Sequence, residues 1–215
     1  MAWIKQLQSA NWVQAAGCAL GAYLLGCLAS GYYLVRARSG RDIREIGSGS
    51  TGARNVSRVL GKPGFGLTVL GDFSKGALAV WAAQAWTGNH HLAALAMLAV
   101  VVGHIWPVPL QFRGGKGAAT SLGALLMFDY RMALTLAALF LAGFGLTRKS
   151  VLPGMFAFAS LPLVSLWFDP DGLTAALTAI LSAMILFAHR KNMVEEIAVL
   201  SARRPGAPKP ESPEL

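Results

Sequence analysis

Residues 12–35 read Trp-Val-Gln-Ala-Ala-Gly-Cys-Ala-Leu-Gly-Ala-Tyr-Leu-Leu-Gly-Cys-Leu-Ala-Ser-Gly-Tyr-Tyr-Leu-Val, without a single Asp, Glu, Lys or Arg. An α-helix needs about 20 predominantly apolar residues to cross the hydrocarbon core of a bilayer. The run is too long for the core of a signal peptide, which has about 7–15 residues. This stretch therefore predicts a membrane-spanning helix that is retained in the protein.

Further stretches that lack Asp, Glu, Lys and Arg include residues 76–112, 132–147 and 172–189. Of the 215 residues, 54% are hydrophobic and 13% are charged, whereas soluble domains carry about 25% charged residues. These features predict an all-α, polytopic membrane protein with a single integral-membrane domain over residues 1–200. A disordered cytoplasmic tail is expected over residues 201–215, which are rich in proline and lack apolar periodicity. Seven transmembrane helices are expected, over residues 12–35, 64–87, 91–110, 117–128, 131–147, 151–168 and 172–188.

The fourth and fifth of these segments are short, and the alternative is one long helix that continues through Asp129-Tyr130-Arg131. The charges of the loops favour two helices. With seven spans and the N-terminus outside, sixteen of the nineteen Lys and Arg residues fall on one face of the membrane. Because cytoplasmic loops are enriched in Lys and Arg, we expect the N-terminus outside and the C-terminus in the cytoplasm. The segments on the cytoplasmic face are then 36–63, 111–116, 147–150 and the part from residue 189 onward.

Nineteen basic and ten acidic residues give a net charge of +9. In a membrane protein this excess indicates loops that face anionic lipid head groups, so membrane lipids rather than nucleic acid are the expected partners. Cys18 and Cys27 are the only cysteines. Nine residues apart on one helix, they would point to opposite faces, which argues against both a disulfide and a metal site.

A first polar cluster is Gly47-Ser48-Gly49-Ser50-Thr51-Gly52-Ala53-Arg54-Asn55, followed by Arg58. It matches the pattern G-x-G-x-x-G, but no strand is predicted before it, so the dinucleotide-binding interpretation fails its structural context. A backbone nest for a phosphate group, with the Ser48 hydroxyl and Arg58 converging on it, fits better. The alternative is a flexible glycine loop without a ligand.

A second cluster begins with Gly103-His104-Ile105-Trp106-Pro107 and ends with Arg113-Gly114-Gly115-Lys116-Gly117. It is not a P-loop, because Gly117 stands where that motif needs Ser or Thr for magnesium. Pro107 and Pro109 should end the preceding helix. His104 is either a hydrogen-bonded residue of helix packing or part of a site.

A third cluster is His189-Arg190-Lys191-Asn192, at the inner end of the last span. His189 and Asn192 share a helix face and can reach one ligand, whereas Arg190 and Lys191 fit interfacial cations. The loop before residue 151 adds Ser150. In the second span, Asp72 and Lys75 are three residues apart and are either a structural ion pair or functional.

The patterns of several other enzymes are missing. No His is followed five residues later by Asp, and no D-x-x-D-G run occurs. The acidic residues expected on the cytoplasmic face show no metal-ligand spacing; they are Asp42, Glu45, Glu195 and Glu196. The sequence predicts a site without a metal or cofactor that binds phosphate groups at the membrane surface.

In order and spacing the three clusters resemble motifs of the membrane-integral bacterial acyl-phosphate:glycerol-3-phosphate acyltransferases. That family shows G-S-G-N-x-G-A-T-N…R, G-H-x-x-P…F-K-G-G-K-G-x-A-T and H-R-x-N, and the corresponding segments here are 47–58, 103–120 and 189–192. Residues 72–76 also look like the family's second helix. The chain departs from the pattern at Ser50, Arg54, Pro109 and Glu195, where the family usually has Asn, Thr, an aromatic residue and Arg.

The resemblance implies acyl transfer from a fatty acyl phosphate to the 1-hydroxyl of sn-glycerol 3-phosphate. The products would be lysophosphatidic acid and phosphate, in the first acylation of phospholipid synthesis. The site would face the cytoplasm from a bacterial plasma (inner) membrane. It would use Lys116, His189, Asn192 and Ser48 in catalysis, and Asn55, Arg58, Gly114, Gly115, Gly117 and Ser150 in substrate binding.

Acyl phosphate is already activated, so binding two phosphoryl groups close together can supply most of the rate. Two acceptors for the hydroxyl proton stay open: His189 and a substrate phosphate oxygen. The alternative function is a membrane transporter for a phosphorylated organic anion. Against it stand the placement of all three clusters on one face and the absence of repeated halves.

Overall fold

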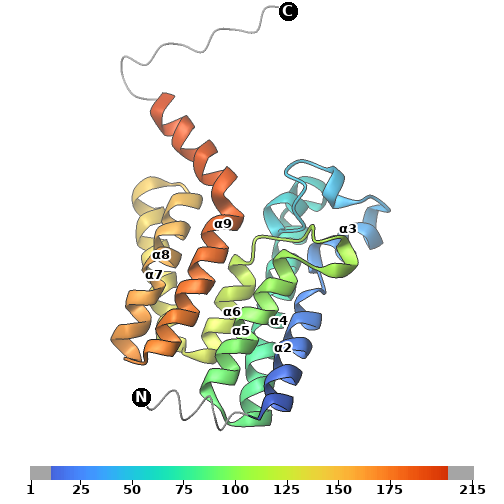
Figure 1. Cartoon of the computed structure of the whole chain (residues 1–215). Helices are drawn as coiled ribbons and strands as arrows, with labels where there is room; N and C mark the ends of the chain where they lie inside the picture. Colours follow the sequence, from blue (N-terminus) through green and yellow to red (C-terminus); the bar gives the residue numbers. More distant parts are fainter. Residues whose placement is uncertain (1–10, 203–215) are drawn as a thin grey trace, which may run out of the picture.

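The computed structural model describes residues 11–202, and within them the chain forms eight α-helices and two short 3₁₀-helices (Figure 1). The expected all-α class is therefore confirmed for this part of the chain. The elements are α2 (Trp12–Gly26), α3 (Ser30–Ser39), η1 (Ile43–Glu45), α4 (Ala53–Thr87), α5 (His90–Ile105), η2 (Val108–Leu110), α6 (Ala118–Phe128), α7 (Tyr130–Thr147), α8 (Val151–Phe168) and α9 (Gly172–Ala202). Most of the segment 201–215, expected to be a disordered tail, lies outside the described residues.

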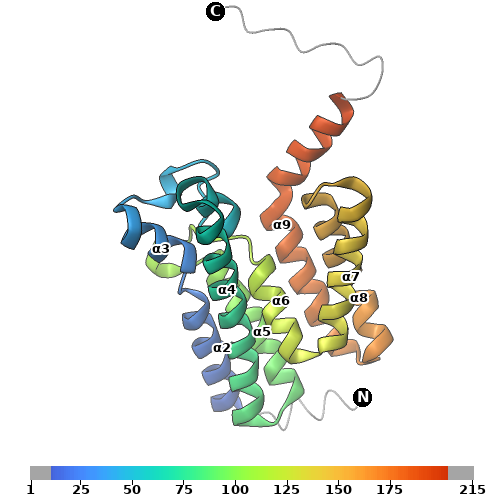
Figure 2. The same cartoon turned by 180° about the vertical axis from the view of Figure 1, so that it is seen from behind.

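The helices form two adjoining groups, with α2, α4, α5 and α6 in one and α7, α8 and α9 in the other (Figures 1 and 2). The chain runs up and down between two ends of the bundle. The segments before α4, between α5 and α6, and between α7 and α8 all lie at the end where α9 finishes. The three polar clusters of the sequence are thus gathered at one end of the molecule.

Five helical stretches in the described residues are long and apolar enough to cross a membrane. The shorter apolar helix α6 accompanies them. Many large hydrophobic side chains on the outside of the bundle are exposed, including Leu146 (88%), Trp167 (83%) and Leu163 (72%). Soluble monomers rarely expose apolar surface on this scale, whereas lipid covers it in a membrane protein. The five stretches are Trp12–Ser39, His90–Leu110, Tyr130–Thr147, Val151–Phe168 and Gly172–Ser201.

The first predicted span, residues 12–35, is not one continuous helix as expected. Helix α2 ends at Gly26, and α3 begins at Ser30. The ammonium group of Lys75 in α4 donates to the carbonyl oxygens of Gly26 (3.1 Å) and Leu28 (2.8 Å). These bonds satisfy carbonyl groups that the helix break leaves without partners, which a membrane interior otherwise makes costly.

Helix α4 starts eleven residues before the predicted span 64–87, and it contains a kink. Gly61 has φ 64° and ψ −158°, and Pro63 follows two residues later. A proline inside a helix removes one backbone donor and clashes with the preceding turn, and the positive φ favours glycine. The kink separates the first turns of α4, which carry the polar residues Asn55 and Arg58, from the apolar length.

Helices α6 and α7 are separate, so the alternative of one helix through residue 129 is wrong. Asp129 is extended (φ −153°, ψ 106°), and its side chain accepts from the amide of Arg131 at 2.9 Å. The guanidinium of Arg131 also pairs with the Asp129 carboxylate at 2.6 Å. An Asp N-cap of this kind starts a new helix, and α7 runs back along the bundle (Figure 2).

Candidate active site

Asn55 organises the first loop, residues 40–52, from the first turn of α4. Its side chain is 2% exposed. Its Nδ2 donates to the carbonyl oxygens of Ile43 (3.1 Å), Ile46 (2.8 Å) and Ser50 (2.9 Å), and its Oδ1 accepts from the amide of Ser48 (3.1 Å). All these bonds are internal to the loop, so Asn55 shapes it and does not face outward.

Ser48 and Arg58 are brought together at the surface of the first loop. A Cβ added to Gly47 would lie 2.2 Å from Nη1 of Arg58, so the guanidinium lies directly against this glycine. Gly47 and Gly49 have positive φ, 56° and 68°, which favours glycine. Both Ser48 and Arg58 are exposed, so a hydroxyl and a cation are available next to each other.

Backbone hydrogen bonds to the end of α5 close the second loop, residues 106–117. The amide of Gly115 donates to the carbonyl of His104 (3.0 Å), and the amide of Gly114 donates to that of Ile105 (3.2 Å). A Cβ at Gly114 would lie 2.1 Å from the His104 carbonyl oxygen. The two glycines thus permit a close approach of backbone to backbone, and their amides are already occupied.

The amides that stay free in the second loop follow these two glycines. Within residues 11–202, the amides of Lys116 and Gly117 make no hydrogen bond. The first amides of α6 have no acceptor inside the helix either, because a helix begins with unpaired N–H groups. Gly117 has φ 84° and leads directly into α6. This end of α6 therefore offers donors and partial positive charge to an anion.

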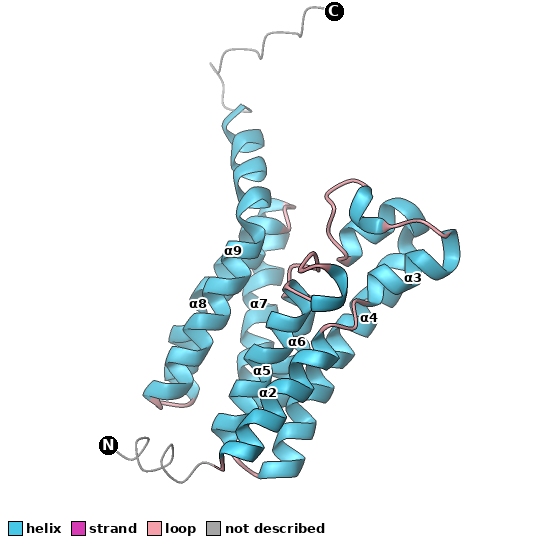
Figure 3. Ribbon diagram, turned by 45° about the vertical axis from the view of Figure 1, so that its right-hand side comes forward, coloured by secondary structure: helices cyan, strands magenta, loops and turns pink. Residues whose placement is uncertain are grey.

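Three hydrogen bonds join the first loop to the second. Arg113 donates to the carbonyl of Arg44 (3.1 Å), and Arg44 donates through Nη1 to the carbonyl of Leu110 (2.9 Å). The amide of Thr51 donates to the carbonyl of Gly114 (3.3 Å). Figure 3 shows the two loops next to each other at one end of the bundle. Two sequence clusters about sixty residues apart thus form one surface.

Helix α9 completes this surface through Lys116. The ammonium of Lys116 donates to Oδ1 of Asn192, and His189 lies one turn earlier on the same face. Nδ1 of His189 is 2.9 Å from the carbonyl oxygen of Ile185. Because a carbonyl can only accept, Nδ1 carries the hydrogen, and Nε2 of the neutral ring keeps a lone pair.

Ser150 stands at the start of α8 and is exposed. The start of α8 is tied to α9, because the amide of Leu152 donates to Oε1 of Glu196 at 3.0 Å. Glu196 lies one turn beyond Asn192. Ser150 therefore belongs to the same end of the bundle, but no hydrogen bond within residues 11–202 joins its side chain to the other site residues.

The site is strongly cationic around Lys116. Partial burial lowers the pKa of the Lys116 ammonium from its usual value. The carboxylate of Glu195 raises this pKa, whereas the cations Arg54, Arg58 and Lys191 lower it further. These side chains come from α4 and α9, so both flanks of the second loop contribute to the field at Lys116.

The structure thus brings Lys116 and Asn192 into contact, with His189 one turn away, and joins the loop of Ser48 and Arg58 to the loop of Lys116. Three of the predicted substrate-binding residues have internal roles in this geometry. These are Asn55, Gly114 and Gly115, whose side chain or amides hold the two loops in shape.

Sequence reasoning missed the residues that tie these parts together. The sequence gives no signal for Arg44. Arg113 and Thr51 stand out there only as members of their clusters, and Glu196 only as an acidic residue without metal-ligand spacing. Their contacts join residues 44 to 69 positions apart along the chain, and no local pattern signals such pairs. Among the described residues, no group of three or more His, Cys, Asp or Glu side chains is arranged to hold a metal ion.

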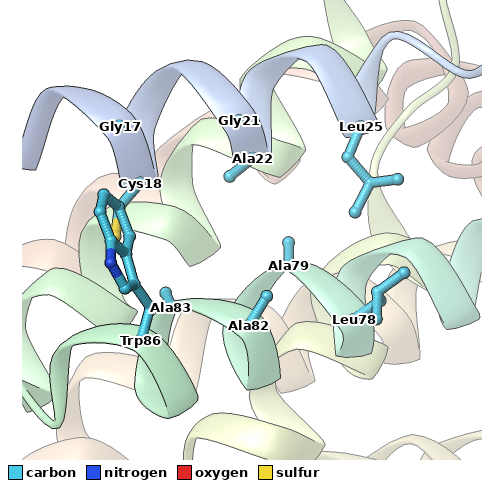
Figure 4. A pocket seen from close by; sticks show the side chains of 10 residues that line it. All are labelled: Gly17, Cys18, Gly21, Ala22, Leu25, Leu78, Ala79, Ala82, Ala83 and Trp86. Carbon is cyan, nitrogen blue, oxygen red and sulfur yellow. The ribbon is translucent and has the colours of Figure 1, made fainter. Parts of the chain in front are cut away.

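A cavity of about 440 Å³ lies elsewhere, between α2 and α4. Figure 4 shows that small side chains line its middle and that the indole of Trp86 covers one end. No charged side chain and none of the predicted site residues borders it. Its lining residues are Gly17, Cys18, Gly21, Ala22, Leu25, Leu78, Ala79, Ala82, Ala83 and Trp86.

An apolar helical bundle with joined, cationic, amide-rich loops at one end defines a membrane protein that handles a phosphorylated ligand. The family model described as "Glycerol-3-phosphate acyltransferase" matches residues 16–198. Glycerol-3-phosphate acyltransferase 1 of Desulfitobacterium hafniense (strain Y51) is 45% identical over 185 residues, covering 86% of this chain and 92% of its own. The enzyme of Laribacter hongkongensis (strain HLHK9) is 42% identical, with 87% and 95% covered.

A solved structure agrees with these relatives. The crystal structure of PlsY (YgiH), described as an integral membrane glycerol 3-phosphate acyltransferase in its glycerol 3-phosphate form, superposes with a TM-score of 0.79. It is 31% identical, and the match covers 86% of this chain and 92% of that one. The chain belongs to the glycerol-3-phosphate acyltransferase family. It is a membrane-bound acyltransferase, and the transporter alternative is set aside.

Proposed function

We propose that the protein transfers the acyl group of a fatty acyl phosphate to the 1-hydroxyl of sn-glycerol 3-phosphate, releasing lysophosphatidic acid and inorganic phosphate. The observation that carries the proposal is the contact of Lys116 with Asn192. It joins α9 to the second loop, which is itself hydrogen-bonded to the first loop, so the three segments border one cationic surface. The relatives are glycerol-3-phosphate acyltransferases, which supports glycerol 3-phosphate as the acceptor. The absence of an acyl-enzyme nucleophile pattern in the sequence favours an activated donor such as acyl phosphate.

Two phosphoryl groups must meet in this site, and their charges repel each other. Lys116 and the free amides at the start of α6 would hold the phosphate of the acyl donor. Ser48 and Arg58, with His189 and Asn192, would hold glycerol 3-phosphate. Charge-assisted hydrogen bonds of this kind are short and strong, and they fix orientation as well as affinity. Gly117 would shape the subsite of the acyl donor, because its positive φ allows the turn into α6.

The chemical step needs no covalent intermediate. The 1-hydroxyl oxygen attacks the acyl carbonyl carbon, the bond from that carbon to the phosphate oxygen breaks, and phosphate leaves with the electron pair. The hydroxyl proton passes to an acceptor, for which the site offers Nε2 of His189 and the phosphate oxygens of the substrates. The free amides of the second loop and the cations stabilise the charge that develops.

The membrane orientation is part of the proposal. Seven crossings, an outside N-terminus and a cytoplasmic C-terminus would place the site on the cytoplasmic face of a bacterial plasma (inner) membrane. The separate helices α6 and α7, and the gathering of the basic loops at one end of the bundle, support it. In a variant without Cys18 and Cys27, a single cysteine at position 169 should react with an impermeant maleimide in intact cells. A cysteine at position 150 should react only after lysis, and the reverse pattern would contradict the orientation.

The reaction itself is tested with purified protein in detergent. Palmitoyl phosphate and labelled glycerol 3-phosphate should give lysophosphatidic acid and an equal amount of inorganic phosphate. The same assay with palmitoyl-CoA should give no product, and excess chelator should leave the rate unchanged. Efficient turnover with palmitoyl-CoA, or loss of activity in chelator, would show that the donor or the chemistry is different.

A further inference from the structure

A second cavity, of about 370 Å³, lies between α3 and α4 at the kink of α4. It is at the end of the bundle that carries the loops. Both views show α3 beside this part of α4, on the side away from α7, α8 and α9 (Figures 1 and 2). None of the residues placed in the proposed substrate contacts borders it. Its lining residues are Leu34 and Arg38 of α3 and Leu60, Pro63, Gly64 and Leu67 of α4.

One face of each helix forms a wall of this cavity. The two lining residues of α3 are four positions apart, and those of α4 include positions 60, 64 and 67, so each set follows one side of its helix. The kink opens the space between the walls, because Gly61 has φ 64° and Pro63 cannot donate a backbone hydrogen bond. Gly64 is buried and adds no side chain to fill it. The cavity is therefore built into the fold by the kink of α4.

Arg38 is the one charged side chain in the lining of the cavity. It is exposed, and within residues 11–202 its guanidinium makes no hydrogen bond or ion pair. Other arginines of this region are engaged: Arg36 donates to the carbonyl of Gly40 at 2.7 Å, and Arg44 pairs with Asp42 at 2.6 Å. A cation that no protein group neutralises thus borders an otherwise apolar cavity.

The cavity lies where the apolar surface of α4 meets the cationic end of the bundle. On the apolar side, the large hydrophobic side chains of Phe65 and Leu70 are exposed. On the other side, the exposed cations Arg41 and Lys62 adjoin the end of α3 and the kink of α4. In a membrane protein, exposed cations next to an apolar surface belong at the level of the lipid head groups. A ligand in the cavity meets positive charge at one end and hydrophobic side chains along its length.

We infer that this cavity binds one anionic phospholipid, with its phosphate at Arg38 and one acyl chain along the leucines of both walls. A guanidinium binds phosphate oxygens through two parallel hydrogen bonds. Basic pockets between membrane-spanning helices bind phospholipid head groups. A free phosphate ion satisfies only Arg38 and leaves the apolar walls uncovered, whereas a phospholipid covers both parts. The bound lipid fills the space that the kink opens and holds α3 against α4.

The charged part of the site is tested by native mass spectrometry of the purified protein in neutral detergent. The added lipids are phosphatidylglycerol and phosphatidylcholine with the same chains, of which only the first carries a net negative charge. The wild type should bind phosphatidylglycerol about fivefold more tightly than phosphatidylcholine. Arg38→Gln should remove this preference. Arg148→Gln, at an exposed arginine of the same end that borders neither cavity, should keep it. Equal losses in both variants, or no preference in the wild type, would overturn the inference.

The apolar part is tested without a change of charge. Leu67→Gln places a polar group in one wall, so binding of phosphatidylglycerol should weaken by about fivefold. Its matched control is Leu70→Gln, at an exposed leucine of α4 outside the cavity lining, which should bind as the wild type does. Thermal unfolding separates the two sources of phosphate: phosphatidylglycerol should raise the unfolding temperature, and inorganic phosphate at the same concentration should not. Equal stabilisation by inorganic phosphate, or equal affinities of the two leucine variants, would show that no phospholipid occupies the cavity.

Discussion

The replacement of Lys116 by Met tests the site most directly. Met keeps a straight side chain of similar length, and it removes the ammonium that donates to Asn192. A hydrogen bond to a charged group contributes about 1.5–3 kcal/mol. At about 1.4 kcal/mol for each factor of ten, kcat/KM should fall by roughly 10- to 150-fold. We expect a loss near the upper end of this range, because the attraction between the ammonium and a phosphoryl group is stronger in a partly buried site.

The matched control is Lys62→Met, because Lys62 is an exposed lysine near the kink of α4 and the change removes the same charge. Exposed charges are screened over about 8–10 Å at ordinary ionic strength, so its activity should stay within about twofold of wild type. The assay is the initial rate of lysophosphatidic acid formation from palmitoyl phosphate, with thermal unfolding used to show that both variants are folded. Equal losses in the two variants would mean that the basic residues act only as a general positive field. The specific role of Lys116 would then be refuted.

Two further predictions concern the same loop. In Gly115→Ala the new Cβ meets His104 Nε2 at 2.1 Å, so activity should fall by about tenfold or more. The control is Gly66→Ala, at a helical glycine with open space around it. This variant should keep its activity and unfold at a slightly higher temperature. The pH–rate profile should lose activity on the alkaline side as Lys116 deprotonates, at a lower pH than for an ordinary lysine, because its pKa is lowered by burial. Glu195→Gln should move this alkaline limb to lower pH, because it removes a charge that raises the pKa of Lys116. Arg54→Gln should move the limb to higher pH, because it removes a charge that lowers this pKa. Shifts of the same sign in both variants would contradict this electrostatic origin.

The helical class and the membrane setting follow from the sequence by itself. Charge-free stretches long enough to cross a bilayer leave no other way to satisfy the backbone. The motifs also drew attention to Lys116 and Asn192, which the structure brings into contact, because glycine-rich turns and cations with fixed spacing are local features. The separation of α6 from α7 was also predicted, from the charges of the loops, and in the structure Asp129 caps the start of α7.

Only the tertiary structure decided which groups of those motifs are free to act. Asn55 looked like a substrate ligand in the sequence, yet its amide is used by three carbonyls of its own loop. Gly114 and Gly115 looked like phosphate-binding amides, yet the end of α5 occupies them. The break at residues 27–29 likewise depends on Lys75, which lies far along the chain. A donor or acceptor is available only if no closer partner takes it, and those partners come from segments that meet only after folding.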